Sequence, residues 1–326
     1  MKAKAKDKVN DKVTGTTTFG RVALIGLGLI GSSIARAVKS QHLADELVAT
    51  DASAQVRARA REIGLADRIA DSSREAVEGA DIVIACVPVG ACGAVAKDIA
   101  PHLKPGAIVS DTGSVKAAVR NDMAESLPAN VHFIPGHPVA GTEQSGPDSG
   151  FSELFVNRWC ILTPPDGASP KAVERLKAFW QALGANVETM GAEHHDLVLA
   201  ITSHLPHLIA YTIVGTADEL EGVTESEVLK FSAGGFRDFT RIAASDPTMW
   251  RDVFLNNKDA VLEMLGTFQE DLSKLTRAIR RGDGEVLFEH FSRTRAIRRG
   301  ILDIGQDAAS ADFGRPHRGL PGKTKS

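Results

Sequence analysis

Short runs of apolar, often β-branched residues alternate with helical patterns from residue 21 to about residue 190. These runs are apolar throughout instead of alternating with polar residues, which is typical of parallel strands that are covered on both faces. Between them, the spacing of apolar residues indicates helices at 30–40, 55–63 and 171–183. The predicted strands are 21–25, 47–50, 82–87, 108–111, 131–135, 159–163 and 186–189.

Strand-like runs disappear after residue 192, and the remaining pattern is helical. We therefore expect an α/β fold, in which a doubly wound, mostly parallel sheet of the Rossmann type is followed by an all-α domain. The predicted helical segments of the second part are 192–220, 225–231, 247–281 with an internal break, and 285–304.

Composition places the chain among ordinary soluble globular proteins. Apolar residues make up 43% and charged residues 24% of its 326 residues, and the net charge of −3 favours neither nucleic acid nor an anionic lipid surface as a partner. Glycine, proline, serine or histidine interrupts the longest apolar runs before the roughly 20 residues of a membrane span, so no membrane is expected. Cys86, Cys92 and Cys160 form neither a disulfide framework nor a paired zinc motif, which fits a cytoplasmic protein.

Both ends of the chain are polar. Residues 1–18 contain five lysines and two aspartates but lack the apolar stretch of a signal peptide. Residues 306–326 are rich in glycine, proline and basic side chains. We expect both ends to be disordered tails.

A glycine-rich turn follows the first predicted strand and opens the first helix. Its G-x-G-x-x-G pattern lets the backbone approach a pyrophosphate, and the helix N-terminus supplies free N–H groups. Asp51 ends the next strand, 20 residues after Gly31, where a carboxylate can bind the ribose hydroxyls. Because that carboxylate repels a 2′-phosphate, NAD is favoured over NADP, although Arg57 and Arg59 lie just downstream. The cofactor-binding candidates in the turn are Gly26, Gly28, Leu29, Ile30 and Gly31.

Two further loops are predicted at the same edge of the sheet. Val87 and Pro88 follow one strand, and residues 111–116 follow the next, so both loops should open onto the cofactor crevice. Thr112 is therefore a further cofactor-binding candidate. Capping of the next helix by the polar residues of 111–116 is an alternative that is compatible with ligand contact.

A histidine stands at the end of the predicted strand 131–135. His137 lies between Gly136 and Pro138, two residues with special backbone preferences. Beside the predicted nicotinamide site it is suited to proton transfer. A hydrogen bond from this histidine to a loop is the alternative interpretation.

Five motifs in this order resemble those of the prephenate/arogenate (cyclohexadienyl) dehydrogenases, and the resemblance covers residues 20–304. It implies that the chain oxidises prephenate or arogenate with a nicotinamide cofactor while carbon dioxide leaves, with His137 as the base and Ser114 beside the same hydroxyl group. No metal is implied. The motifs are Gly-Leu-Gly-Leu-Ile-Gly-Ser-Ser (26–33), Asp-Thr-Gly-Ser-Val-Lys (111–116), Gly-His-Pro-Val-Ala-Gly-Thr-Glu (136–143), Ser-His-Leu-Pro-His (203–207), and Gly-Gly-Phe-Arg-Asp-Phe-Thr-Arg-Ile-Ala (234–243) with Asp-Pro-Thr-Met-Trp (246–250).

The resemblance also assigns residues to the substrate pocket. Arg241 matches the arginine that binds the substrate carboxylate, whereas pairing with Asp238 or Asp246 at the surface is the alternative reading of this residue. The family forms dimers through its helical domains, so we expect a homodimer. The remaining matches are His207, Ser203, Gly234 and Trp250 in the pocket, Thr142 and Glu143 near its mouth, and His195 as a further lining residue.

The apolar helix predicted at 192–220 fits a wall of the pocket, although it carries several histidines. Zinc binding by His194, His195, His204 and His207 is disfavoured because no cysteine or carboxylate set has ligand spacing. Pro206 should distort the helix and free the carbonyl of Thr202.

The predicted organisation is a dinucleotide-binding domain over 19–190 and a helical substrate and dimerisation domain over 191–305. Two other functions stay open: a β-hydroxyacid-type dehydrogenase and a non-catalytic nicotinamide-sensing module. The first should carry a catalytic lysine on the helix at 192–220, which has none, and the second needs neither His137 nor Arg241. The choice between prephenate and arogenate is not determined by the sequence.

Overall fold

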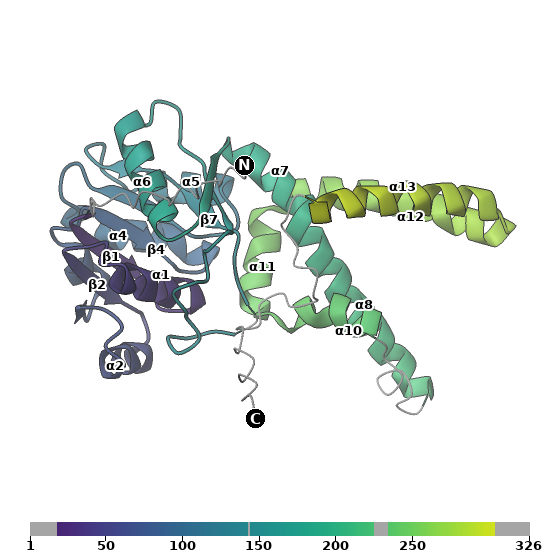
Figure 1. Cartoon of the computed structure of the whole chain (residues 1–326), viewed down its shortest axis with the longest axis horizontal. Helices are drawn as coiled ribbons and strands as arrows, with labels where there is room; N and C mark the ends of the chain where they lie inside the picture. Colours follow the sequence, from purple (N-terminus) through teal and green to yellow (C-terminus); the bar gives the residue numbers. More distant parts are fainter. Residues whose placement is uncertain (1–17, 143, 225–233, 304–326) are drawn as a thin grey trace, which may run out of the picture.

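The computed structural model describes residues 18–142, 144–224 and 234–303. A sheet-containing part is built from the first half of the chain, and long helices of the second half extend away from it (Figure 1). The predicted tails lie outside the described residues except for Thr18, and so does the predicted helix at 225–231.

Six parallel strands form the main sheet, in the order β3-β2-β1-β4-β5-β6. The order reverses between β1 and β4, and ligands of such sheets bind in the crevice beside the carboxyl ends of the strands at this point. The predicted fold class is therefore confirmed. The strands are β1 (Arg21–Ile25), β2 (Glu46–Thr50), β3 (Arg68–Ile69), β4 (Ile82–Ala85), β5 (Ile108–Asp111) and β6 (His132–Phe133).

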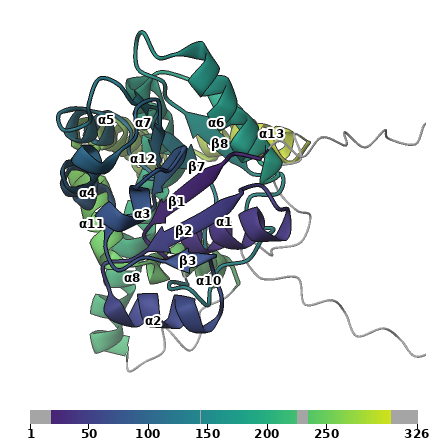
Figure 2. The same cartoon turned by 90° about the vertical axis from the view of Figure 1, so that its left-hand side faces the viewer.

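Helices cover both faces of this sheet, as the continuous apolar strands predict. In β1, Val22 and Leu24 belong to one core cluster, whereas Ala23 and Ile25 belong to the other, because successive side chains of a strand point to opposite faces. Figure 2 shows α1 and α6 on one side of the strands and α4 and α5 on the other. The helices of this part are α1 (Leu29–Ser40), α2 (Ala54–Glu62), α3 (Ser73–Val77), α4 (Cys92–Ile99), α5 (Ala117–Ala124) and α6 (Pro170–Ala182), with the short 3₁₀ turns η1 (Val89–Ala91) and η2 (Ala100–His102).

A second, three-stranded sheet follows, and it corrects one prediction. It consists of β7 (Gly136–Pro138), β8 (Trp159–Leu162) and β9 (Asn186–Thr189), with β7 antiparallel to β8. The strand predicted at 131–135 is wrong in its end. The N–H groups of His132 and Ile134 bond to main-chain oxygens beside and in β5, but the next donor in register, Gly136, binds the side chain of Asp111, and Pro135 already accepts from Thr163, which follows β8 of the second sheet. The chain leaves the main sheet there, and His137 lies inside β7, opposite Ile161, instead of after the end of a main-sheet strand.

The second part is helical in the described residues. A π-helical turn lies just before Pro206, which cannot donate a hydrogen bond to the carbonyl of Thr202, so the predicted distortion takes this form. The internal break predicted within 247–281 falls at Asn257. The elements are α7 (Ala192–Leu199), the π turn η3 (Ala200–His204), α8 (Leu205–Thr224), α10 (Gly234–Thr240), the 3₁₀ turn η4 (Arg241–Ala244), α11 (Pro247–Asn256), α12 (Lys258–Arg281) and α13 (Gly284–Asp303).

Helix α11 attaches the helical part to the main sheet. Trp250 and Val253 of α11 belong to the core cluster that also holds Val89 and residues of α4 and α5. The carboxylate of Asp252 lies 3.2 Å from the position that a Cβ on Gly90 would occupy. The predicted domain limits stay predictions, but β9 ends at Thr189 and α7 begins at Ala192.

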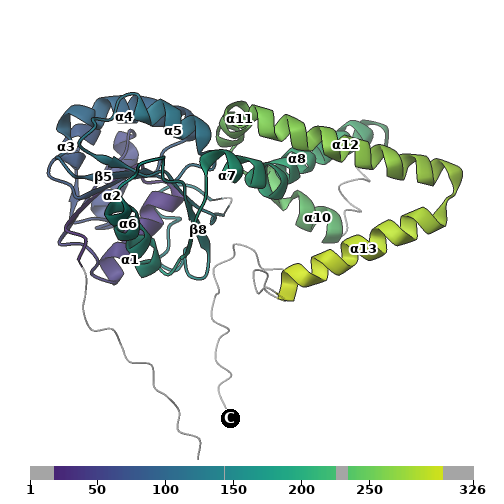
Figure 3. The ribbon, with the colours of Figure 1, turned by 90° about the horizontal axis from the view of Figure 1, so that it is seen from above.

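The long helices carry apolar side chains that a single chain does not cover. Helices α12 and α13 form a hairpin that extends away from the sheet (Figure 3), and Phe288 is 72% exposed. Extended apolar surfaces of this kind mark interaction sites. The other large exposed side chains of this hairpin are Leu262, Leu272, Ile279, Val286, Phe291 and Ile297.

One helical stretch has the composition of a membrane span. Ala192–Glu219 is long enough to cross a membrane, and its most apolar 18-residue window has a mean hydropathy of 1.6, with 28% of that window buried within the chain. The expectation that every apolar stretch falls short of this length is therefore wrong, because the polar residues inside this window leave its mean hydropathy high. The core helix of a soluble protein can meet the same criteria, so the finding by itself is weak support for a membrane.

Trp180 of α6 offers a test of the core. It is fully buried and packs edge-to-face on Phe155 and Phe179, at centroid distances of 5.4 and 5.9 Å. We expect Trp180→Ala to lower the free energy of unfolding by about 3–5 kcal/mol, because the cavity cannot be refilled. In the control Trp159→Ala, a side chain that is 37% exposed is removed, and the loss should stay below about 1 kcal/mol. Urea unfolding followed by circular dichroism measures both, and equal losses would contradict the packing described.

Candidate active site

The glycine-rich turn between β1 and α1 is tightly packed except on one side. Gly26 has a φ of +96°, and a Cβ there would lie 2.3 Å from the carbonyl oxygen of Cys86. A Cβ on Gly31 would lie 2.0 Å from the carbonyl oxygen of Gly26, whereas one on Gly28 would meet nothing within 4 Å. Gly28 is the N-cap of α1, no side chain caps this helix, and its first turn holds no acidic residue. Leu29 and Ile30 in that first turn therefore present N–H groups suited to a phosphate.

Asp51 lies at the end of β2, beside this turn. Its Oδ2 accepts a hydrogen bond from the N–H of Leu27 at 2.8 Å, and its Oδ1 accepts one from the N–H of Ser53 at 2.8 Å. The carboxylate is therefore held next to the turn, where the sequence predicted a partner for ribose hydroxyls.

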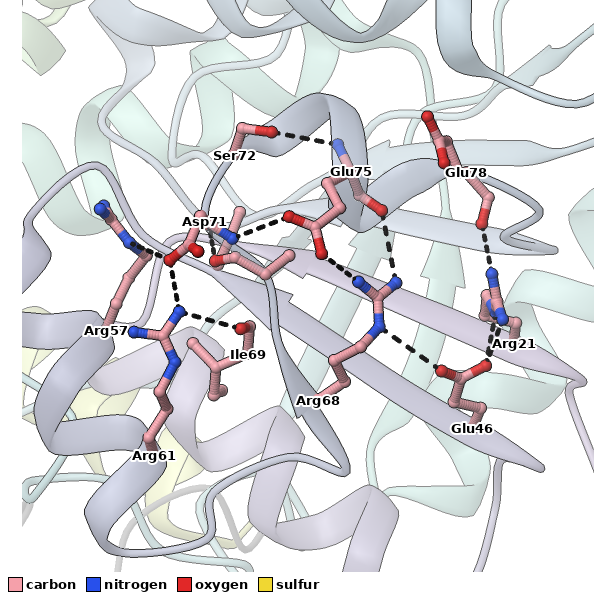
Figure 4. Close-up of polar contacts among 12 residues, drawn as sticks. Arg21, Glu46, Arg57, Arg61, Arg68, Ile69, Asp71, Ser72, Glu75 and Glu78 are labelled. Carbon is pink, nitrogen blue, oxygen red and sulfur yellow. Dashed lines mark hydrogen bonds and ion pairs between the residues drawn. The ribbon is translucent and has the colours of Figure 1, made fainter.

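The arginines near Asp51 already have partners. Arg57 donates through Nη1 to the carbonyl oxygens of Asp51 and Ala52, at 2.7 and 3.1 Å, and its Nε lies 3.8 Å from Asp71. Figure 4 shows Arg57 and Arg61 meeting on Asp71. On α2, Arg59 binds both carboxylate oxygens of Asp148.

The two neighbouring loops close around the glycine-rich turn. The side chain of Val87 lies 3.2 Å from the position of a Cβ on Gly26, and Pro88 is the N-cap of η1. The N–H of Thr112 binds the carbonyl oxygen of Ala85 at 3.1 Å. The structure thus brings the predicted cofactor-binding residues together at the carboxyl ends of β1, β2, β4 and β5.

A buried ion pair joins the loop 111–116 to β7. Lys116 and Asp111 are fully buried and paired, and Lys116 Nζ also donates to the carbonyl oxygen of Gly136 at 2.6 Å. The Asp111 carboxylate accepts the N–H groups of Gly113 and Gly136, at 2.8 and 3.2 Å. Asp111 therefore fixes the strand that carries His137 and caps no helix, so the capping alternative does not hold for it. This role of Asp111 was not predicted from the sequence.

His137 begins a chain of three hydrogen-bonded side chains. Its Nδ1 lies 2.8 Å from Nε2 of His195, and Nδ1 of His195 lies 2.8 Å from Oδ1 of Asp196. His137, His195 and Asp196 are 8%, 0% and 4% exposed. The carboxylate of Asp196 accepts the N–H groups of Lys116 and Ala117, at 2.8 and 2.9 Å, and so caps α5 from another element.

Burial lowers the pKa of His137 well below its usual value of 6.5, and the neighbouring His195 and the positive charge of Lys116 act in the same direction. Burial also lowers the pKa of His195, although Asp196 opposes this. Both imidazoles are therefore neutral near pH 7, and a neutral imidazole can accept a proton.

Asn257, between α11 and α12, holds this region from the other side. Its Nδ2 donates to the carbonyl oxygen of Asp196 at 2.9 Å and lies 3.0 Å from Nδ1 of His204. Burial lowers the pKa of His204 to about 4, while the backbone of Ser114 acts in the opposite direction, which places the loop of Ser114 beside this ring. Asp196 and Asn257 were missed, although the run of polar residues at 194–196 in an apolar helix was a signal for Asp196.

The predicted pocket residues of the helical part form a second group. The ring of His207 stacks on Trp250 at 3.7 Å, and its Nδ1 donates to the carbonyl oxygen of Ser203 at 2.8 Å. Burial lowers the pKa of His207, and the positive charge of Arg241 lowers it further, so Arg241 lies near this ring. Trp250 also faces His204, with ring centroids 6.0 Å apart. Through His204 and Asn257, this group is connected to the hydrogen-bonded side chains of His137, His195 and Asp196.

The other predicted residues show no hydrogen bond, among the described residues, to the His137 group or to the His207 group. Gly234 begins α10, a helix that contacts η4. Thr142 follows β7 and accepts a hydrogen bond only from the N–H of Gln144, at 3.3 Å, among the described residues. Glu143 lies outside the described residues. Within the described ranges, no cluster of three or more histidine, cysteine or acidic side chains could hold a metal ion.

Comparisons with known proteins agree with this architecture. The family model described as "Prephenate dehydrogenase, nucleotide-binding domain" matches residues 34–189, and the one described as "Prephenate dehydrogenase, dimerization domain" matches residues 191–293. The fold and the site define a dinucleotide-binding oxidoreductase with a helical second domain. The chain belongs to the prephenate dehydrogenase family.

Individual relatives cover most of the chain. The cyclohexadienyl dehydrogenase of Zymomonas mobilis is 46% identical over 283 residues, which are 86% of this chain and 96% of that protein. The prephenate dehydrogenase of Bacillus subtilis is 35% identical over 281 residues, 86% of this chain and 76% of that protein. The crystal structure of prephenate dehydrogenase from A. aeolicus with hydroxyphenyl propionate and NAD+ matches with a TM-score of 0.81 at 33% identity, covering 86% of this chain and 98% of that one.

These matches confirm the predicted family, the NAD-binding Rossmann domain and the oxidoreductase class. They decide against the β-hydroxyacid-type dehydrogenase and the non-catalytic sensing module that the sequence left open.

Two glycines of the turn separate folding from cofactor binding. We expect Gly31→Ala to lower the melting temperature, because its methyl group would collide with the backbone at Gly26. Gly28→Ala should melt like the wild type, since nothing surrounds the new methyl group and the φ of −67° suits alanine. It should nevertheless bind NAD at least about tenfold more weakly, because the methyl group fills the space that a pyrophosphate needs. Thermal melting and calorimetric titration with NAD test the pair, and wild-type NAD affinity in Gly28→Ala would refute this placement.

Proposed function

We propose that this chain oxidises prephenate and/or arogenate with NAD, releasing carbon dioxide and forming 4-hydroxyphenylpyruvate and/or tyrosine. The observation that carries the proposal is the neutral, buried imidazole of His137, hydrogen-bonded through Nδ1 and tied to the loop 111–116 at the cofactor edge. Family membership supports the same reaction.

The substrate loses a hydride from the ring carbon that bears its hydroxyl group, and bound NAD accepts this hydride. Positive charge would build up on that carbon unless the hydroxyl proton leaves. His137 accepts this proton on Nε2, a contribution worth roughly 10²–10⁴ in rate. Departure of carbon dioxide makes the ring aromatic and drives the reaction, so the main task of the protein is to hold the reacting groups in place.

Substrate contacts come from both parts of the chain. Ser114, in the loop between β5 and α5, binds the same hydroxyl group as His137. Arg241 binds a substrate carboxylate, because a guanidinium makes paired, charge-assisted hydrogen bonds with it. His207, stacked on Trp250, lines the pocket with Trp250, Ser203 and Gly234, and Thr142 lies near its mouth.

NAD is preferred over NADP on the evidence of the surrounding charges. Asp51 places a negative charge where a 2′-phosphate would lie, and repulsion there disfavours NADP. Arg57 and Arg59 are engaged by carbonyl oxygens and by Asp148, so neither is available to offset this repulsion without losing its present partners.

The protein acts as a homodimer in the cytoplasm. The apolar faces of 192–219 and of the α12–α13 hairpin need a partner, and a second helical domain of the same kind can cover them. Three cysteines without a disulfide fit a reducing compartment. Neither nucleic acid nor a membrane is required as a partner.

The reaction can be tested directly with purified protein. NADH formation is followed by absorbance after addition of NAD with prephenate, and in parallel with arogenate. Turnover with at least one substrate, coupled to release of one carbon dioxide per NADH, is expected. Absence of NADH formation with both substrates would overturn the proposal.

His137→Asn should reduce kcat by about 10²–10⁴-fold and leave KM nearly unchanged, because the base acts in the transition state. Burial lowers the pKa of His137, so the base stays neutral below pH 6.5. In the wild type, kcat/KM should therefore decline only once the pH falls below 6.5, as His137 becomes protonated. Steady-state kinetics from acid to neutral pH check both points, and a decline that begins above pH 6.5 would contradict the role of the buried imidazole.

Arg241→Ala should act on binding instead of turnover. Loss of a charge-assisted pair of about 1.5–3 kcal/mol corresponds to roughly a 10–100-fold higher KM, with kcat changed only a few-fold. Arg74→Ala is the matched control, since Arg74 pairs with Asp98 on the far α3–α4 surface. If the effect of Arg241→Ala falls on kcat alone, Arg241 does not bind the ground-state substrate.

A further inference from the structure

Asp196 is surrounded by hydrogen-bond donors. Its Oδ1 faces the N–H of Lys116 and Nδ1 of His195, each at 2.8 Å, and its Oδ2 faces the N–H of Ala117 at 2.9 Å. Two of these donors are main-chain groups, which cannot reverse their roles. A carboxylate that accepts every bond satisfies all of them, so the Nδ1 atom of His195 carries a hydrogen.

The direction of the next hydrogen bond follows from this assignment. His195 is neutral because burial lowers its pKa, and a neutral imidazole has a hydrogen on only one nitrogen. Its Nε2 therefore has a lone pair and accepts from Nδ1 of His137 across 2.8 Å. His137 is also neutral, so its Nε2 has no hydrogen and can accept a proton.

We propose that His195 and Asp196 are positioning residues that hold His137 in the tautomer with a hydrogen on Nδ1, which leaves Nε2 as the proton acceptor. This role rests on the proposed function of His137 as the base. His195 and Asp196 reach the substrate only through His137, so they act by orienting it and by settling which nitrogen is free.

The charged and titratable groups around His137 favour this arrangement. When His137 takes a proton, the imidazolium is connected through His195 to the negative charge of Asp196, which offsets the opposing charge of Lys116. The main chain of Asp196 is held in turn by Asn257 at 2.9 Å, so α12 stabilises the position of the pair. The titratable groups that act on the imidazole of His137 are Lys116, His195 and His204. Asp111 is paired with Lys116, and Cys160 interacts with the main chain of His137.

The tautomer can be read without any turnover. In ¹⁵N spectra of the full-length protein with labelled histidine, the resonances of His137 are identified by their loss in His137→Asn. We expect a protonated Nδ1 and an unprotonated Nε2 for His137 near pH 7. A hydrogen on Nε2 in the wild type would overturn the proposal.

Substitutions of His195 test the consequence for the reaction. His195→Phe removes the acceptor and should lower kcat by roughly 10²-fold, with KM within about threefold, and should abolish the Nδ1–H signature of His137. His195→Gln keeps a carbonyl oxygen that can accept from His137, and we expect it to restore kcat to within about tenfold of the wild type. Asp196→Asn should produce a loss similar to that of His195→Phe, because the amide can reverse the direction of the hydrogen bonds that run through His195 to His137.

The adjacent His194 supplies matched controls, because it is exposed on the same helix. His194→Phe and His194→Gln should keep the kcat, the KM and the His137 spectrum of the wild type. A folded His195→Phe protein with wild-type kcat, or one whose loss lies only in KM, would refute the positioning role. If the wild type turns over neither substrate but shows the Nδ1–H tautomer, the proposed function fails while the hydrogen-bond assignment stands.

Discussion

The carboxylate of Asp196 is the point on which the two parts of the molecule depend. It lies at the start of the helical part, yet it accepts main-chain N–H groups at the beginning of α5, a helix of the sheet part. The same carboxylate orders His195 and, through it, His137 on the second sheet. A buried carboxylate is costly unless each oxygen is hydrogen-bonded, so the native arrangement of all three elements is strongly coupled. Loss of any one donor would leave a buried charge with too few partners.

A second buried carboxylate, that of Asp111, connects the edge of the main sheet to β7 by hydrogen bonds and an ion pair. Asp111 binds Lys116, the N–H of Gly113 inside the loop 111–116 and the N–H of Gly136 in β7, and Lys116 reaches the carbonyl oxygen of Gly136. The strand that carries His137 therefore begins at a fixed distance from the loop that carries Thr112 and Ser114. Two adjacent ion and hydrogen-bond networks thus fix the position of His137 relative to the edge of the main sheet at which the glycine-rich turn lies.

Much of the candidate site was predictable from local sequence. The glycine-rich turn, Asp51 and the two following loops are defined by strand ends and by fixed spacing, and parallel strands bring their carboxyl ends together without further information. His137 was found for the same reason, although its strand was assigned to the wrong sheet, because the passage of the chain from β6 into a second sheet was not anticipated. Asp196, Lys116 and Asn257 were not found as partners, since their contacts join residues separated by up to 80 positions.

The sequence by itself determined the alternation of strands and helices, the helical second part and the dinucleotide turn, and it marked His137 as the candidate base, because periodicity and glycine spacing act over a few residues. The tertiary structure decided which nitrogen of His137 faces His195, which carboxylates are buried and where α11 joins the main sheet. These properties depend on burial and on donors that arrive from distant segments, and side-chain periodicity carries no information about either. The apolar character of the long helices was determined partly by each. It is visible in the sequence, but only the fold shows that a single chain leaves these apolar side chains exposed.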